Sequence, residues 1–93
     1  MEDRITSEKL EKYFGITKTA LNKVKLKIIN GKESEAKQII DMVENYLKDA
    51  RFFEQKGDLI NAFAAVNYSH GWLDCGVRLE IFNVSDDQLF TIK

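Results

Sequence analysis

The sequence predicts an all-α fold, an up-and-down three-helix bundle in a single domain over residues 1–93, and three observations support this prediction. Proline is absent, and proline is the residue that most strongly interrupts helices. Apolar residues recur every three or four positions, which is the period of an amphipathic helix. Asn30-Gly31 and Gly57-Asp58 have the composition of helix boundaries. They divide the chain into helices at about residues 6–29, 33–56 and 58–82, followed by a short C-terminal helical turn or tail.

Composition is typical of an ordinary globular domain and excludes some functions. Hydrophobic residues make up 44% of the chain and charged residues 31%, as in soluble domains generally. No apolar run is long enough to span a membrane, and the N-terminus lacks the apolar core of a signal peptide. Cys75 is the only cysteine, so no disulfide can form within the chain. We therefore expect a cytoplasmic protein without a membrane partner.

The first helix is expected to begin after Thr6 or Ser7, because either residue can cap it. Its apolar stripe consists of Leu10, Phe14, Thr17, Leu21, Val24 and Ile28. Asn30-Gly31 is expected to end this helix, since glycine adopts the left-handed C-cap conformation at low cost.

The second helix is expected to start near residues 32–34 and to stop at Gly57, with Asp58 as the N-cap of the third helix. Its apolar stripe consists of Ala36, Ile39, Ile40, Val43, Tyr46, Leu47, Ala50 and Phe53. A joint of one or two residues predicts a tight antiparallel hairpin of the second and third helices.

The third helix is predicted to be the central one, because it is apolar on two sides. On a helical wheel, one face carries Leu59, Ala62, Val66, Leu73 and Val77. The roughly opposite face carries Ala65, Tyr68, Trp72 and Leu79. We expect each of these faces to pack against a neighbour.

The C-terminal residues are too apolar for a free tail. Asn83 is expected to stop the third helix, and Ser85 with Gln88 has the spacing of a capping box for one short helical turn. Leu89, Phe90 and Ile92 are expected to fold back over an open end of the bundle. The alternative is that they cover a partner chain.

The third helix also carries a specific motif. The run GDLINAFAAVNYSHGWLDCGVRL, preceded by DARFFEQK, resembles the archaeal family catalogued as domain of unknown function 357. Members of that family share a Gly-Asp joint, an Asn-Ala-Phe-Ala start and a Tyr-x-His-Gly-Trp-Leu-Asp core. The resemblance covers essentially the whole chain. It implies a small three-helix bundle in an archaeal cytoplasm, and it implies no activity.

A polar stripe on the third helix is the place where chemistry is most plausible; it consists of Asn67, His70, Asp74 and Arg78. His70 and Asp74 are four residues apart, so they can meet on the helix surface. A carboxylate beside an imidazole can orient a general base. The interpretation that we favour is a buried polar network with no catalytic residue, which ties this helix to its neighbours. A site for a small anion or a partner protein is the third interpretation.

No cofactor and no metal site are predicted. One histidine and one cysteine cannot build a His/Cys metal site alone. The second helix has no Glu-x-x-His motif of the kind that di-iron bundles use. The glycines are too dispersed to form a phosphate loop.

Lysines are concentrated in the first third of the chain. Residues 1–32 contain eight Lys or Arg and four Asp or Glu, a net charge of +4. Lys18, Lys25 and Lys27 form the candidate nucleic-acid face. These lysines are spread around the helix, and the pI of 5.8 is not typical of a dedicated nucleic-acid binder. A solvated helix face is the simpler interpretation.

We therefore predict a non-enzymatic helical interaction or scaffold module with an unknown protein partner. Its hairpin resembles the helix pairs of tetratricopeptide-type scaffolds, in which one unit cannot bury both of its faces alone. Tyr13, Tyr68 and Trp72 are the candidate interface, because aromatic residues concentrate at interfaces. We expect a weak homodimer. Weak RNA binding and a small-ligand or enzymatic site around His70 and Asp74 are the alternatives.

Overall fold

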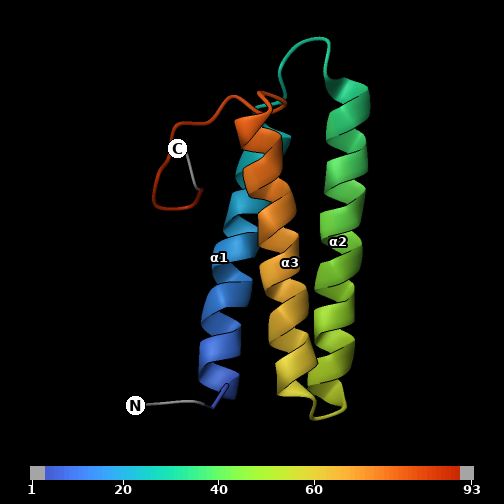
Figure 1. The fold of residues 1–93 in the computed structure, drawn as a ribbon, viewed down its shortest axis with the longest axis vertical. Coiled ribbons are helices and arrows are strands. Elements are labelled where there is room, and N and C mark those ends of the chain that lie inside the picture. Colours follow the sequence, from blue (N-terminus) through green and yellow to red (C-terminus); the bar gives the residue numbers. More distant parts are fainter. Residues whose placement is uncertain (1–3, 91–93) are drawn as a thin grey trace.

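The computed structural model describes residues 4–90, and over that range it is a three-helix bundle. The helices are α1 (Ser7–Lys25), α2 (Glu33–Gln55) and α3 (Leu59–Arg78). They run up, down and up, with α3 between α1 and α2 in the view of Figure 1. The predicted all-α fold and its topology are confirmed.

The joint between α2 and α3 forms as the sequence predicts. Gly57 has a φ of +78°, and its amide bonds to the carbonyl of Glu54 (3.0 Å) while the Asp58 amide bonds to that of Phe53 (2.9 Å). This pair of bonds is a Schellman C-cap, which favours glycine at the left-handed position. The Asp58 side chain then accepts from the Asn61 amide (3.1 Å) and caps α3.

The start of α1 also follows the prediction, but its end does not. The Thr6 hydroxyl accepts a hydrogen bond from the Lys9 amide (3.0 Å), so Thr6 is the N-cap. The helix ends at Lys25, four residues before the expected boundary at 29. Gly31, with a φ of +92°, belongs to the loop before α2 and does not cap α1.

The third helix ends at Arg78 and not at the expected residue 82. Glu80 adopts the left-handed conformation, with a φ of 60°, and the Ile81 amide bonds to the Gly76 carbonyl (2.8 Å). The expected stop at Asn83 is therefore wrong.

A short pairing between the two loops explains both early ends. Ile28 and Phe82 form an isolated antiparallel bridge. On either side of it, the Ile29 amide bonds to the Ile81 carbonyl (2.9 Å) and the Asn83 amide to the Lys27 carbonyl (2.7 Å). Extended backbone at these residues pairs amides and carbonyls of the two loops with one another, in place of the bonds that they would make within longer helices. Ile28 is therefore not part of the α1 stripe.

The core lies where the three apolar stripes meet. Among residues 4–90, the buried apolar side chains are Leu10, Ala20, Leu21, Val24, Ala36, Ile39, Val43, Leu47, Ala50, Ala62, Ala65, Val66, Leu73, Val77, Ile81, Phe82 and Phe90. The α2–α3 contact is the most extensive, α1 packs mainly on α3, and α1 and α2 touch little. The second apolar face of α3 is only partly covered, because Tyr68 and Leu79 are exposed. The expectation of a neighbour along all of that face is wrong within the chain described.

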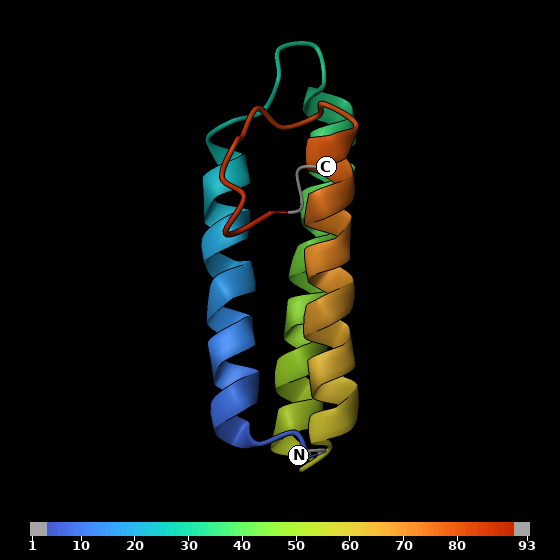
Figure 2. The same ribbon diagram turned by 60° about the vertical axis from the view of Figure 1, so that its left-hand side comes forward.

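The segment after α3 folds back onto the bundle. Figure 2 shows it crossing from the end of α3 to α1 and turning down beside it. Phe90 is buried, as expected for a segment that packs on its own chain. Asp86, and not Ser85, caps the final turn, because its side chain accepts from the Gln88 amide (2.9 Å) and the Leu89 amide (3.3 Å). Ile92 lies outside the described residues.

Candidate functional site

His70 lies at the junction of α1, α3 and the C-terminal segment. Its Nε2 donates a hydrogen bond to the carbonyl oxygen of Leu89 (2.6 Å), because a carbonyl can only accept. In the neutral ring, Nδ1 then accepts from the hydroxyl of Thr17 (3.0 Å). Thr17 is a buried polar residue in the stripe of α1, so this bond gives its hydroxyl a partner. Both ring nitrogens of His70 are therefore engaged.

Asp74 lies beside His70 as its position four residues later on α3 requires. Its Oδ1 is 3.8 Å from Nε2 of His70, and the two side chains are 23% and 26% exposed. A contact of that length adds an ion pair only when the imidazole is protonated. Because Nε2 already donates to Leu89, the ring has no unoccupied nitrogen with which to accept a proton from a substrate in this conformation.

The four residues of the predicted polar stripe do not share one site. Asn67, His70 and Asp74 line an open pocket of about 390 Å³ between α1, α3 and the C-terminal segment. Arg78 lines a different pocket of about 610 Å³, next to Glu80 and the bridge residue Phe82. The helical wheel places the four side chains on one stripe, but the stripe divides between Asp74 and Arg78, which line different pockets.

The three aromatic interface candidates lie in two places. Tyr13 is half-buried and contacts Phe63 edge to face, with ring centroids 5.3 Å apart. Tyr68 is 54% exposed and contacts Tyr46 (4.7 Å) and Trp72 (6.5 Å) between ring centroids. Two shallow apolar pockets of about 320 and 330 Å³ flank Tyr68 along α3. The exposed aromatic surface therefore belongs to α2 and α3.

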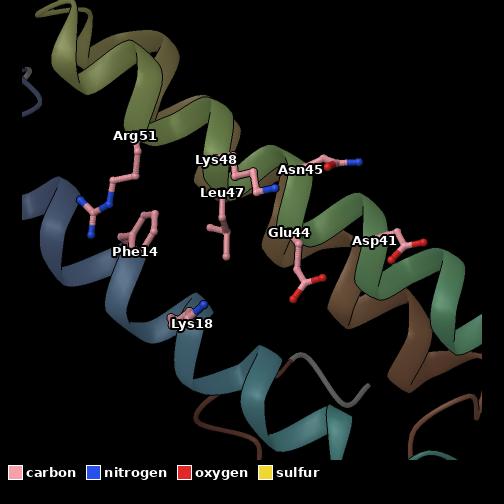
Figure 3. Close-up of a pocket in the computed structure, with 8 residues that line it drawn as sticks. All are labelled: Phe14, Lys18, Asp41, Glu44, Asn45, Leu47, Lys48 and Arg51. Carbon is pink, nitrogen blue, oxygen red and sulfur yellow. The ribbon is translucent and has the colours of Figure 1, made fainter.

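The three lysines of the candidate nucleic-acid face have different surroundings. Lys25 forms an ion pair with Glu44 of α2 (2.8 Å). Lys27 follows the end of α1, in the loop that pairs with residues 81–83. Lys18 lines a cleft of about 620 Å³ between α1 and α2, shown in Figure 3. They do not form one continuous basic surface.

The sequence did not indicate the polar contacts that connect α1 to α2. Arg51 binds both carboxylate oxygens of Glu11 (2.8 and 2.9 Å) and also Glu54 (2.8 Å). Its guanidinium stacks 3.6 Å from the ring centroid of Phe14. The hydrogen bond from Arg51 lowers the pKa of Glu11, and the bond to Glu11 raises the pKa of Arg51 further. Glu11 and Arg51 are 40 residues apart, so no local pattern could have paired them.

A second unanticipated ion pair fixes the C-terminal segment to α1. Lys23 of α1 contacts Asp86 at 2.9 Å. This hydrogen bond, followed by the one from the Gln88 amide, lowers the pKa of the Asp86 carboxyl. Lys23 and His70 together hold the segment beside the polar pocket, through Asp86 and the Leu89 carbonyl.

Neither a metal site nor a membrane span is found in the described part of the chain. Within residues 4–90, no cluster of three or more His, Cys, Asp or Glu side chains has the arrangement of a metal site. In the same range, no helix combines the length and apolar character needed to cross a membrane.

Comparison with known proteins identifies a family and no activity. Neither the curated proteins nor the solved structures contain a match to this chain. One family model, described as a protein of unknown function (DUF357), matches residues 12–82. That range includes all of α2 and α3 and most of α1, so this chain belongs to the DUF357 family.

Proposed function

We propose that this chain is a non-enzymatic helical interaction module that self-associates through the outward face of α3. That face consists of Ile60, Ala64, Tyr68, Gly71, Cys75 and Leu79, all of them exposed. A helix face in contact with water normally carries charged residues, yet these six positions carry none, and Arg78 in the last turn is the exposed charge of α3 beside them. Ile60 is 72% exposed, Tyr68 54% and Leu79 62%. Apolar surface of this kind is typical of contact sites.

The order of side chains along this face is self-complementary. A two-fold axis that crosses α3 between Ser69 and His70 would place a second copy antiparallel. Tyr68 of one copy then lies opposite Gly71 of the other, so the largest side chain of the face meets the position that has none. Symmetric dimers need such a match, because each surface must recognise itself.

The same axis also matches the two outer pairs of the face. Ala64 lies opposite Cys75, and both are small enough for the helices to approach closely. Ile60 lies opposite Leu79, the C-cap of α3, which joins the two most exposed apolar side chains of this face. A contact confined to one helix from each copy is small, so we expect a weak, concentration-dependent dimer.

The matched pair of glycines, Gly71 and Gly15, gives the test. Both lie inside helices, and a Cβ added at either position has no atom within 4 Å to meet, so Gly71→Gln and Gly15→Gln should both fold. Light scattering over a range of concentrations should show self-association of the wild type and of Gly15→Gln, and a monomer for Gly71→Gln. A wild type that is monomeric throughout, or equal association of both variants, would contradict the proposal.

A cysteine cross-link tests the antiparallel register. In Ala64→Cys, the new thiol should form a disulfide with Cys75 of the second copy on mild oxidation. The two positions within one chain are about 16 Å apart along the helix, which is too far for an internal disulfide. Glu35→Cys, an exposed position on α2, is the control and should cross-link slowly. Equal cross-linking of the two variants would exclude this register.

The alternative roles have weaker support. An enzymatic site at His70 and Asp74 would need a ring nitrogen that is open to a substrate, and both nitrogens are engaged. RNA binding along α1 would need Lys18, Lys25 and Lys27 to act together, and Lys25 is paired with Glu44. We also propose a reducing, cytoplasmic location, in which the exposed thiol of Cys75 would persist on the face that we assign to self-association.

A further inference from the structure

The cleft between α1 and α2 is built differently from every other contact in the bundle. The two helices touch little, and ion pairs bridge the space between them at two levels. Arg51 binds Glu11 near one end, and Lys25 binds Glu44 (2.8 Å) toward the other. Between these bridges lies the cleft of about 620 Å³. In Figure 3, Arg51, Leu47 and Glu44 extend from α2 toward α1, Phe14 extends from α1 toward α2, and Asp41 and Asn45 point away from α1. The volume of the cleft is in the range of small-molecule sites.

Most charges that border the cleft already have partners. Arg51 is paired with Glu11 and Glu54. Glu44 is paired with Lys25, and Asp41 with Lys37 at 3.2 Å. The other two cations in the lining of the cleft are Lys18 and Lys48.

Lys18 of α1 and Lys48 of α2 both line the cleft, and neither has a hydrogen bond or ion pair with any residue in the range 4–90. They come from different helices, so the tertiary fold brings these two ammonium groups to one cavity. Two like charges in a shared cleft raise the local positive potential. An anion placed between them would interact favourably with both.

The remaining lining indicates the rest of the ligand. Leu47 is buried and Phe14 half-buried, and both line the cleft. In Figure 3, Leu47 lies between Lys18 and Lys48, and Phe14 lies to one side, next to Arg51. The side-chain amide of Asn45 adds one uncharged polar group to the lining. Such a mixture of an apolar surface with a few polar groups is typical of small-ligand pockets.

We propose that this cleft binds a small phosphate monoester, whose phosphate lies between Lys18 and Lys48 and whose apolar or aromatic part contacts Phe14 and Leu47. Lysine binds phosphate as a point charge without a fixed geometry, which suits two flexible side chains on opposite walls. A polymeric phosphate chain is disfavoured, because its further negative charges would meet the carboxylates of Asp41 and Glu44, which also line the cleft. This inference does not rest on self-association through α3.

Phenyl phosphate is a suitable probe, and its binding can be followed by NMR through the backbone amides. We expect saturable shifts concentrated at residues 14–18 and 44–51 at millimolar ligand. The variant Lys18→Gln/Lys48→Gln should bind at least about tenfold more weakly, since each charge-assisted contact contributes at least that factor. Helicity of the variant should not change, because both side chains are exposed.

The matched control is Lys27→Gln/Lys32→Gln. It removes the same two charges from exposed positions outside the cleft, and it should bind phenyl phosphate as the wild type does. Equal loss in both variants would show non-specific charge screening and would overturn the proposal, as would the absence of saturable shifts. A uridine oligomer that binds more tightly through the same lysines would overturn it in favour of a nucleic-acid surface.

Discussion

The contact between α2 and α3 and the space between α1 and α2 show two ways of positioning one helix against another. Along α2 and α3, many of the buried residues are small, including Ala36, Ala50, Ala62, Ser69 and Gly76, so the helices approach closely and exclude water. Between α1 and α2, long charged side chains span an open cleft. Apolar contacts of the first kind depend on area and fit, while ion pairs of the second kind depend on pH and salt.

This difference predicts where the bundle is robust and where it can change. The hairpin of α2 and α3 should form the stable part of the fold. The apolar stripe of α1 anchors it to α3, and its position relative to α2 is set by Arg51 and Lys25. A cleft whose width is set by ion pairs can adjust to a ligand at little cost, whereas a close-packed helix contact cannot.

The largest loss of stability is expected from the centre of the hairpin. Leu73 is fully buried, so Leu73→Ala should lower the free energy of unfolding by about 2–5 kcal/mol through the cavity that it leaves. Urea denaturation followed by circular dichroism measures this loss. Leu79→Ala, on the exposed face of the same helix, should cost far less. Similar losses at the two positions would show that α3 is not packed as described.

The next largest loss of stability is expected at His70, because this side chain holds the C-terminal segment by hydrogen bonds and not by apolar packing. His70→Ala removes the bonds to Leu89 and Thr17 and should cost about 1–3 kcal/mol, since net contributions are about 1 kcal/mol for each bond. It should also speed hydrogen exchange of the Phe90 amide, which bonds to the Asp86 carbonyl (3.1 Å). Asn67→Ala, exposed on the same helix, is the control. Unchanged exchange at Phe90 would show that His70 does not hold the C-terminal segment.

Alanine substitutions at two glycines of α3 should change the free energy of unfolding by smaller amounts and in opposite directions. A Cβ at Gly76 would clash with the ring of Phe82 and lie 3.1 Å from Cδ1 of Ile39. Gly76→Ala should therefore destabilise the fold by about 1–2 kcal/mol, because overpacking outweighs the gain in helix propensity. Gly71→Ala has open space and should stabilise a single chain by up to about 1 kcal/mol. Thermal unfolding at low protein concentration gives both signs, and equal signs would contradict the close packing at Gly76.

The sequence predicts best what local chemistry decides. The stop at Gly57 and the cap at Asp58 depend on residues within one helical turn, and both are confirmed. The predicted C-terminal ends of α1 and α3 are wrong, because the bridge between Ile28 and Phe82 determines where both helices stop. These two residues are far apart in the chain, so no local pattern indicates their pairing. A left-handed conformation at Glu80 could not be expected from a residue that rarely adopts it.

In the candidate site, too, the sequence predicts local relations and does not predict contacts between distant segments. The i, i+4 relation of His70 and Asp74 could be read from the spacing, because both are on one helix. The partners of His70, Thr17 and the Leu89 carbonyl, come from segments distant in sequence. The pairing of Glu11 with Arg51 is equally invisible to periodicity. Patterns within a helix thus locate polar residues, while the tertiary fold determines which of them bind one another.

The smallest effect, and the one most specific to the α1–α2 cleft, is expected from Glu11. The hydrogen bond from Arg51 lowers the pKa of Glu11 in the folded state. The pair therefore contributes fully to stability at pH values above the unfolded pKa of Glu11, about 4.3. This contribution is lost as the pH falls through the lower pKa of the folded state. Because the Glu11 side chain is 58% exposed, Glu11→Gln should cost less than about 1 kcal/mol at pH 7. The difference between wild type and variant should shrink in acid and in high salt.

Urea denaturation of both proteins at neutral and acidic pH measures this difference. Asp49→Asn is the control, since Asp49 is exposed on α2 and has no ion pair among residues 4–90. Its effect should be small at both pH values. If Glu11→Gln instead destabilised the fold equally at every pH, the carboxylate would be acting by packing and not by charge, and the two helices would not be held apart by ion pairs that pH can weaken.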